Sequence, residues 1–206
     1  MNIKSRALFV KGILDALYPN PEIPLKYKDG YSFLIAVLLS AQCTDVRVNI
    51  ITPNLFHLAD NPYDMVKHTV AEIEAVIHTC GLAPSKASYI YRLSQILIEK
   101  YSGEIPSTLE DLESLPGVGH KTASVIMVQY FNQPAFPVDT HIQRCAKRWG
   151  LSSGTSVRET EADLKKLFDA DDWGRLHLQI IYFGREHCPA RGHDQNNCTI
   201  CSKLKK

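Results

Sequence analysis

The sequence predicts an all-α protein built from two helical lobes. Apolar residues recur at spacings of three and four along most of the 206 residues, which is the period of an amphipathic helix. No segment shows the alternation of apolar and polar residues that a half-buried strand requires. Glycines directly follow several helical patterns, where a left-handed residue often ends a helix. We therefore expect helices joined by turns, with 45% apolar residues forming a true core.

The first helix is expected within residues 1–19, where apolar residues follow helical spacing. Lys11 and Asp15 interrupt the run of apolar residues, so the segment lacks the unbroken apolar core of a signal peptide. The apolar run 33–39 is far shorter than the ~20 residues that span a membrane, and we expect a buried helix there. This run belongs to the helical pattern 31–42. Further clear helical patterns lie at 69–81, 86–103, 107–117 and 121–131, and one more follows Asp139.

Two proline-rich connectors, 19–27 and 131–139, suggest crossings between two lobes. One domain is expected over 23–134, as a six-helix barrel that contains the glycine turn described next. The second domain combines 1–22 with 135–206. We expect the active site in the cleft between these lobes.

The turn Pro116-Gly117-Val118-Gly119 joins two helical patterns, the second of which begins near His120. Two glycines spaced by one residue permit positive φ and a close approach of the backbone to a ligand. The N–H groups of the following helix point into the same turn, which makes an anion site that suits a DNA phosphate. The alternative is a tight connector between two packed helices.

Charge is distributed in a way that fits such a site, although the net charge is only +1. Residues 51–114 hold four lysines and arginines against nine acidic residues, whereas 115–150 hold four against one. The basic part of the chain thus begins with the turn, as phosphate binding requires. Ordinary scatter of charge is the alternative explanation.

Lys121 and Asp139 are the candidate catalytic pair. Lys121 lies in the first turn of a helix, where the positive end of the dipole favours the neutral and nucleophilic amine. Asp139 stands just before the next helical pattern, in which Thr140 and Gln143 fit a capping box. The alternatives are an ordinary surface lysine and an aspartate that caps the helix.

The motifs LPGVGHKTA and VDTHIQR resemble the helix-hairpin-helix and Gly-Pro-Asp region of the DNA glycosylase superfamily, and of its endonuclease III branch in particular. The resemblance extends from LLSAQCTD through CGLAPSKA to the C-terminal cysteines. It implies a bifunctional glycosylase and AP lyase of base excision repair that acts on oxidised pyrimidines in double-stranded DNA. Lys121 would be its nucleophile and Asp139 its catalytic carboxylate; the related adenine glycosylases lack this lysine.

The resemblance also assigns residues that open the duplex. Gln42 would bond the base left without a partner, and Leu82 would wedge between bases. Both could instead be ordinary residues at helix ends. Asp45 would line the base pocket or cap a helix. His141 would contact phosphate or sugar, or simply occupy the surface of the helix.

Three cysteines near the C-terminus, Cys188, Cys198 and Cys201, have the spacing C-x9-C-x2-C. The family implies a [4Fe–4S] cluster with C-x6-C-x2-C-x5-C, so the first spacer here is longer and the fourth cysteine would follow Lys206. Cubane clusters usually take four thiolates. His187 or His193 could replace the missing ligand and would also allow a Cys3His zinc site. A [4Fe–4S] cluster is the expected occupant; zinc or an empty loop are the alternatives.

Around this cysteine loop, basic residues are expected to meet the DNA backbone: Arg185, Arg191, Lys203, Lys205 and Lys206. The remaining cysteines are isolated and expected as buried thiols. We expect a monomer without membrane association, located in the cytoplasm with the nucleoid. The rival functions are a glycosylase of different base preference and a DNA-binding module without catalysis.

Overall fold

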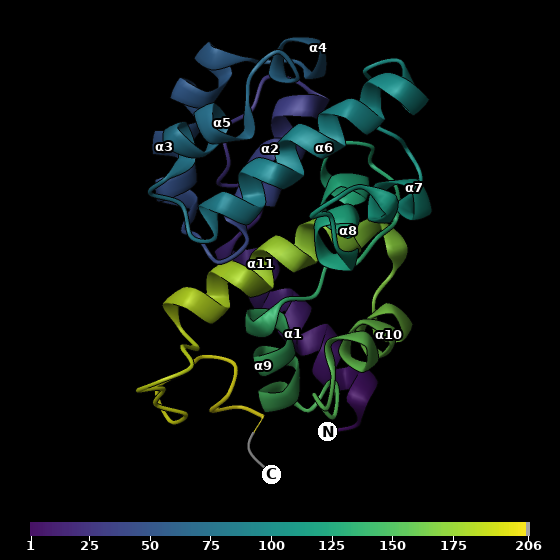
Figure 1. The fold of residues 1–206 in the computed structure, drawn as a ribbon. Coiled ribbons are helices and arrows are strands. Elements are labelled where there is room, and N and C mark those ends of the chain that lie inside the picture. Colours follow the sequence, from purple (N-terminus) through teal and green to yellow (C-terminus); the bar gives the residue numbers. More distant parts are fainter. Residues whose placement is uncertain (205–206) are drawn as a thin grey trace. The chain divides into compact units, whose positions relative to one another are not determined.

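The computed structural model describes residues 1–204 and is entirely helical within that range, which confirms the predicted fold class (Figure 1). No helix of this range is long and apolar enough to cross a membrane. In chain order the helices are α1 (Ile3–Leu17), α2 (Gly30–Ser40), α3 (Asp45–Leu58), α4 (Pro62–Met65), α5 (Val70–Ile77), α6 (Ala83–Tyr101), α7 (Leu109–Ser114), α8 (His120–Gln129), α9 (Thr140–Trp149), α10 (Val157–Leu167), the short 3-10 helix η1 (Ala170–Asp172) and α11 (Trp173–Glu186).

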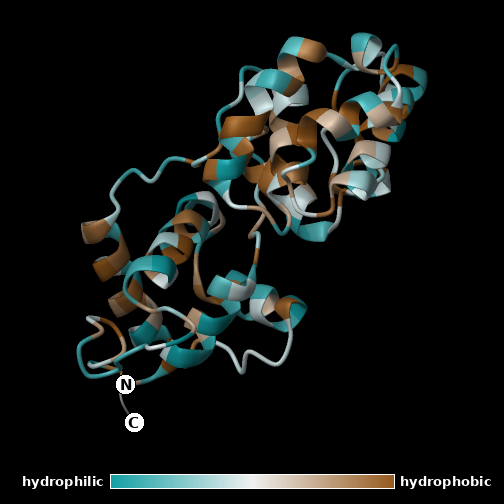
Figure 2. Cartoon of the chain, turned by 60° about the vertical axis from the view of Figure 1, so that its left-hand side comes forward, coloured by the Kyte–Doolittle hydropathy of each residue, from teal (hydrophilic) through white to brown (hydrophobic). Residues whose placement is uncertain are grey.

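The chain forms two compact units. The helical unit Pro24–Phe131 contains α2 to α8, and the terminal unit joins Met1–Ile23 to the chain from Asn132 onward. In the unit Pro24–Phe131 the apolar residues, drawn in brown in Figure 2, gather toward the interior, and the terminal unit has a buried apolar cluster of its own. Each unit therefore has its own core.

The helical unit is organised around α2, which packs against α3, α6 and α8. Every residue of α2 from Gly30 to Leu39 is buried. A helix that is apolar on all sides has no face to offer water, so it becomes the centre of a domain. The short apolar run in the sequence is thus the buried helix that was predicted.

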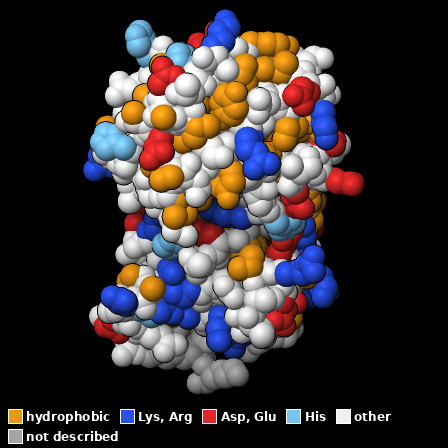
Figure 3. Space-filling model, in the orientation of Figure 1, with side chains coloured by type: hydrophobic (Ala, Val, Ile, Leu, Met, Phe, Trp, Pro, Cys, Tyr) orange, Lys and Arg blue, Asp and Glu red, His pale blue; other side chains and the backbone are white. Residues whose placement is uncertain are grey.

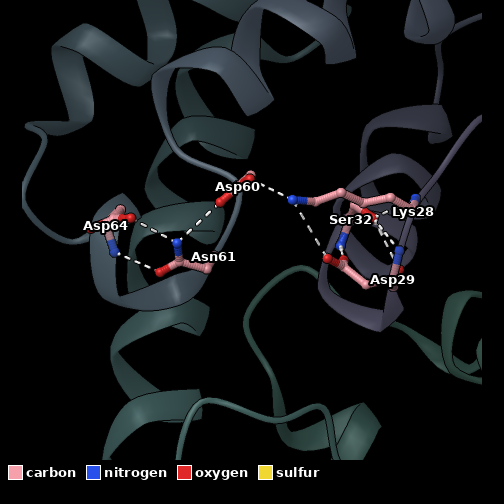
Figure 4. Close-up of polar contacts among 6 residues, drawn as sticks. All are labelled: Lys28, Asp29, Ser32, Asp60, Asn61 and Asp64. Carbon is pink, nitrogen blue, oxygen red and sulfur yellow. Dashed lines mark hydrogen bonds and ion pairs between the residues drawn. The ribbon is translucent and has the colours of Figure 1, made fainter.

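Local side chains fix where α2 and α4 begin (Figure 4). Asp29 accepts a hydrogen bond from the Ser32 backbone N–H at 2.8 Å, and the Ser32 hydroxyl returns a bond to the Asp29 carbonyl. Asn61 caps α4 by accepting from the Asp64 N–H at 3.0 Å. Lys28 pairs with Asp60 between these two caps. Capping of this kind satisfies N–H groups that the first turn of a helix leaves without partners.

The terminal unit packs α9 and α11 together, with α1 against α11 and α10 against α9. Its core centres on the fully buried Trp149, whose ring meets Phe183 edge to face at 5.6 Å between centroids. The C-terminal segment, residues 187–204, follows α11 and carries the three cysteines of the cysteine loop. It joins this core through Cys188, Ile200 and Leu204. The cysteine segment is therefore an integral part of the unit rather than an appendage.

Candidate active site and metal centre

The glycine turn between α7 and α8 is anchored by two buried side chains, Leu115 and Val118. The Val118 N–H donates to the Leu115 carbonyl at 3.1 Å and closes the turn. Gly117 has a φ of +78°, and a Cβ there would lie 2.6 Å from Cδ2 of Tyr89. Both the backbone conformation and the lack of space therefore require glycine at this position.

Gly119 has a different role from the one expected. Its φ of −89° is an ordinary extended conformation, so the expected positive φ occurs at Gly117 and not at Gly119. A Cβ on Gly119 would meet nothing within 4 Å. Gly119 is the N-cap of α8 and brings no capping side chain, so the backbone donors of the first turn can approach an anion closely.

Lys121 lies in this first turn of α8 and is exposed to solvent. Its neighbour His120 pairs through Nδ1 with Oε1 of Glu113 at 2.6 Å, across the turn from α7 to α8. This pairing fixes the histidine relative to α7. The hairpin therefore presents a lysine beside a helix N-terminus, on a turn whose own backbone is held in place.

Asp139 is the N-cap of α9 and accepts a hydrogen bond from the Ile142 N–H at 2.9 Å. The expected capping box of Thr140 and Gln143 is wrong, because Thr140 is already helical and Gln143 donates to the Gly154 carbonyl at 3.0 Å. The cap orients the carboxylate at the start of the helix. Lys121 belongs to the helical unit and Asp139 to the terminal unit, so their pairing stays a prediction.

His141 stands in the first turn of α9, half-buried, with Nδ1 at 3.2 Å from an Arg144 guanidinium nitrogen. Arg144 in turn donates to the carbonyls of Cys188 and Gly184. His141 is thus held by its own helix on the side of the cysteine segment. Its contact with DNA stays a prediction.

Gln42 and Leu82 lie beside each other in the helical unit, although 40 positions separate them. A Cβ on Gly81 would lie 2.5 Å from the Gln42 carbonyl oxygen. Both residues have left-handed backbone, with φ of 52° at Gln42 and 62° at Leu82, a conformation that costs a non-glycine residue roughly 1–2 kcal/mol. Leu82 is also 53% exposed. Strained backbone and an exposed apolar side chain both suit residues that contact a ligand.

Lys86 holds these two loops together, and the sequence analysis missed it. It is only 3% exposed, and its Nζ donates to the carbonyls of Leu39 at 2.8 Å and Ala41 at 2.5 Å and to Sγ of Cys80 at 3.2 Å. Burial raises the pKa of Cys80 above its ordinary value, so the thiol keeps its proton and donates to Leu39. The signal was present, because Lys86 lies on the buried stripe of α6 with Ala83, Ala87 and Ile90.

Asp45 begins α3 but does not cap it. Thr44 is the N-cap and accepts from the Arg47 N–H at 3.2 Å. Of the two roles considered for Asp45, capping is therefore wrong. A carboxylate in the first turn still interacts favourably with the helix dipole.

The C-terminal segment gathers four potential metal ligands: Cys188, His193, Cys198 and Cys201. Their ligand atoms all lie within 4.8 Å of one another, and the three cysteines are buried. His187 is exposed, stands beside Glu186 and is not part of this group. Of the two histidines considered from the sequence, the structure therefore selects His193.

The family and the three cysteines are compatible with a [4Fe–4S] cluster, but the fourth ligand among the described residues is an imidazole, whereas such clusters usually take four thiolates. His193 Nε2 is buried and has no hydrogen-bond partner within residues 1–204. An unsatisfied buried nitrogen beside three thiols is costly unless something binds it. The chemistry of the group is therefore that of a metal site whose ligands differ from the pattern expected.

Two arginines of α9 tie this segment to the helix that Asp139 caps. Arg148 donates to the carbonyls of Cys188 and Pro189 and approaches the Cys188 sulfur at 3.2 Å, and Arg144 donates to the Cys188 carbonyl at 3.1 Å. Hydrogen bonds from the Cys145 and Cys201 thiols, followed by Arg148, lower the pKa of Cys188 well below its usual range. Arg144 and Arg148, two of the four basic residues in 115–150, therefore have structural partners in the C-terminal segment.

Lysine and arginine side chains gather over α9 and the C-terminal segment on the face drawn in Figure 3. Of the five basic residues expected around the cysteine loop, Arg185, Arg191 and Lys203 are exposed. Lys205 and Lys206 lie outside the described residues. The exposed members can reach an anionic partner, and their contact with DNA stays a prediction.

Comparison with known proteins places this geometry in a family. Residues 35–170 match the model of the HhH-GPD superfamily base excision DNA repair proteins. Endonuclease III of Bacillus subtilis (strain 168) is 37% identical over 203 residues, which cover 98% of this chain and 92% of the relative.

Two solved structures are also similar. A non-covalent endonuclease III–DNA complex has a TM-score of 0.94 at 37% identity and covers 100% of this chain and 96% of its own. A trapped covalent endonuclease III–DNA intermediate, an estranged-adenine complex, has a TM-score of 0.92 at 37% identity, with 97% and 94% covered. Likeness of this extent in both sequence and fold leaves one assignment: the chain belongs to the endonuclease III family of the HhH-GPD superfamily.

Proposed function

We propose that this chain is a bifunctional DNA glycosylase and AP lyase that removes oxidised pyrimidines and cleaves the strand on the 3′ side of the abasic site. The observation that carries the proposal is Lys121, exposed in the first turn of α8 beside a turn that only glycine can form. A covalent DNA intermediate has been trapped for a similar endonuclease III, which requires a nucleophile of this kind. A module that only bound DNA would have no use for a lysine paired with the Asp139 carboxylate.

Lys121 carries the covalent chemistry in this proposal. Its Nζ lone pair attacks C1′ while the damaged base leaves with the electrons of the glycosidic bond and takes up a proton. The amine loses a proton, the C1′–O4′ bond breaks as O4′ takes up a proton, and C1′ and Nζ form an imine. Loss of a proton from C2′ then forms the C2′=C3′ bond and breaks the C3′–O bond, so the phosphate leaves. Water finally hydrolyses the imine and releases the lysine.

Asp139 stabilises the positive charge that develops at C1′ as the base leaves. A fixed carboxylate suits this task because it needs no reorganisation during the reaction. The cap bond to Ile142 at 2.9 Å orients that carboxylate at the start of α9. Its structural and its catalytic role therefore use the same placement.

Gln42 and Leu82 open the duplex in this proposal, at a cost of a few kcal/mol for the extruded base. Leu82 supplies an exposed apolar wedge next to Gln42, and Lys86 keeps their two loops together. Gly117, Val118, Gly119 and His120 form the phosphate grip, with His141 as a further contact. The protein acts as a monomer on chromosomal DNA, and the C-terminal metal centre holds its segment against α9.

Borohydride trapping on DNA with an abasic site tests the proposal. The parent chain should form a covalent complex, and Lys121→Gln should form none. Lys100→Gln is the matched control, because Lys100 is an exposed lysine in the last turn of α6. Trapping that persists in Lys121→Gln would show that the nucleophile lies elsewhere. A panel of duplexes with oxidised pyrimidines, mismatches and alkylated purines then distinguishes this substrate class from a glycosylase of other preference.

The identity of the metal at the C-terminal site does not affect the proposed reaction. The family resemblance supports a [4Fe–4S] cluster there, whereas the donor set supports a single ion. Neither occupant takes part in the chemistry at C1′.

A further inference from the structure

The C-terminal segment folds into a cage whose shape is set by its own hydrogen bonds. Gly192 adopts a φ of +69° immediately before His193. Asp194 then turns the chain back, since its carboxylate accepts from the Asn196 N–H at 2.8 Å and its carbonyl from the Cys198 N–H at 3.0 Å. The turn brings His193 to the three thiols. The spacing is thus C-x4-H-x4-C-x2-C, and the long first spacer is what accommodates the histidine.

Distances within the cage match the ligands of one ion. The sulfurs of Cys188 and Cys201 are 3.9 Å apart, and the four ligand atoms lie within 4.8 Å of one another. Zn–S bonds of about 2.3 Å in tetrahedral geometry place two sulfurs about 3.8 Å apart. The thiolates of a cubane each bind a different iron, so they stand farther apart than the ligands of a single ion. The short separation of these ligand atoms therefore favours a single ion over the cubane.

Burial and charge also suit a single ion. The three cysteines are buried, and His193 Nε2 lacks a hydrogen-bond partner among the described residues. Three thiolates around a divalent cation leave one net negative charge, and Arg148 lies 3.2 Å from the Cys188 sulfur. A positive group in this position stabilises the bound form and orients the Cys188 sulfur through a hydrogen bond.

We propose that this segment binds one zinc ion through Cys188, His193, Cys198 and Cys201, in place of the iron–sulfur cluster of the family. Binding releases the remaining thiol protons to solvent and involves no change of oxidation state. All four positions are occupied by protein, so the site is closed and structural. It holds the segment against α9, the helix that Asp139 caps.

Elemental analysis of the full-length chain tests the proposal without reference to activity. We expect about one zinc per chain, little iron, and no absorbance band at about 400 nm of the kind that iron–sulfur proteins show. Exchange for Co2+ should give the visible ligand-field bands of a tetrahedral ion bound by thiolates. Brown protein with about four irons per chain, or folded protein that holds no metal, would each overturn the proposal.

Two histidine variants identify the fourth ligand. His193→Ala should bind zinc at least 10-fold more weakly, because even the loss of a residue that only orients a metal ligand weakens binding by about 10-fold or more. The control His187→Ala should bind zinc as tightly as the parent chain. His193→Cys should retain zinc and strengthen the thiolate-to-cobalt absorption of the Co2+ form, which keeps the test decisive if His193→Ala does not fold. Unchanged affinity and an unchanged Co2+ spectrum in the His193 variants would refute the assignment.

Discussion

Asp139 offers a clean separation of stability from catalysis, because the structure gives it a cap role that asparagine can fill. Asp139 accepts a hydrogen bond from the Ile142 N–H at 2.9 Å. Asp139→Asn keeps an oxygen that can accept this bond but removes the negative charge. Asp139→Ala removes both. The pair of variants therefore distinguishes the carboxylate as a cap from the carboxylate as a catalyst.

Magnitudes for the two variants differ in a predictable way. Asparagine caps about as well as aspartate, and loss of a cap to alanine costs roughly 1 kcal/mol. Loss of the charge next to the helix dipole adds about 0.3–1 kcal/mol in both variants. Asp139→Ala should thus lower the free energy of unfolding by about 1.5 kcal/mol, or about 3–6 °C in Tm for a chain of this size. Asp139→Asn should lose about 0.5 kcal/mol.

Catalysis should not follow that order. Removing a preorganised charge from the transition state costs roughly 10²–10³ in rate, so both variants should lose excision to a similar degree. Single-turnover excision from a duplex with one oxidised pyrimidine measures this, and thermal unfolding of the same samples measures stability. Asp139→Asn that excises at the parental rate would refute the catalytic role and leave Asp139 as a cap alone.

Two further substitutions test the parts that hold the DNA-facing loops. Lys86→Met leaves the Ala41 carbonyl without its donor and weakens the bonding of Leu39. It should lower the free energy of unfolding in urea by about 2–3 kcal/mol and weaken binding to DNA, whereas a loss below 0.5 kcal/mol would contradict the role of Lys86. Gly117→Ala meets both a φ of +78° and the Tyr89 ring, so it should cost about 2 kcal/mol or more and reduce DNA affinity. Gly12→Ala is its control, because a Cβ there meets nothing within 4 Å and alanine should stabilise α1 by about 0.5–1 kcal/mol.

Local features of the hairpin could be predicted because neighbouring residues determine them. The fold class followed from periodicity, and the requirement for glycine at Gly117 followed from the turn. Gly119 was expected to share that requirement, but its φ of −89° follows from its place as the N-cap of α8. The sequence allowed either Asp139 or Thr140 to be the N-cap of this helix. The structure shows that α9 begins at Thr140, which makes Asp139 the N-cap.

Residues that act across long sequence separations were missed or left open for the opposite reason. Lys86 reaches carbonyls 45 and 47 positions away, and a lysine in a helical pattern is ordinarily a surface residue. Arg148 looked like part of a basic surface, but it bonds the backbone about 40 positions further on. No spacing rule covers such pairs.

By itself, the sequence determined the helical fold class, the glycine turn with Lys121 beside it, and the cluster of three cysteines as a candidate metal site. Each of these depends on residues within a few positions of one another, where backbone geometry is nearly fixed by residue type. Tertiary structure decided that His193 and not His187 joins the cysteines, and that Gln42 and Leu82 are neighbours. Those outcomes depend on how segments far apart in the sequence pack, because such contacts form only when a whole unit buries its core.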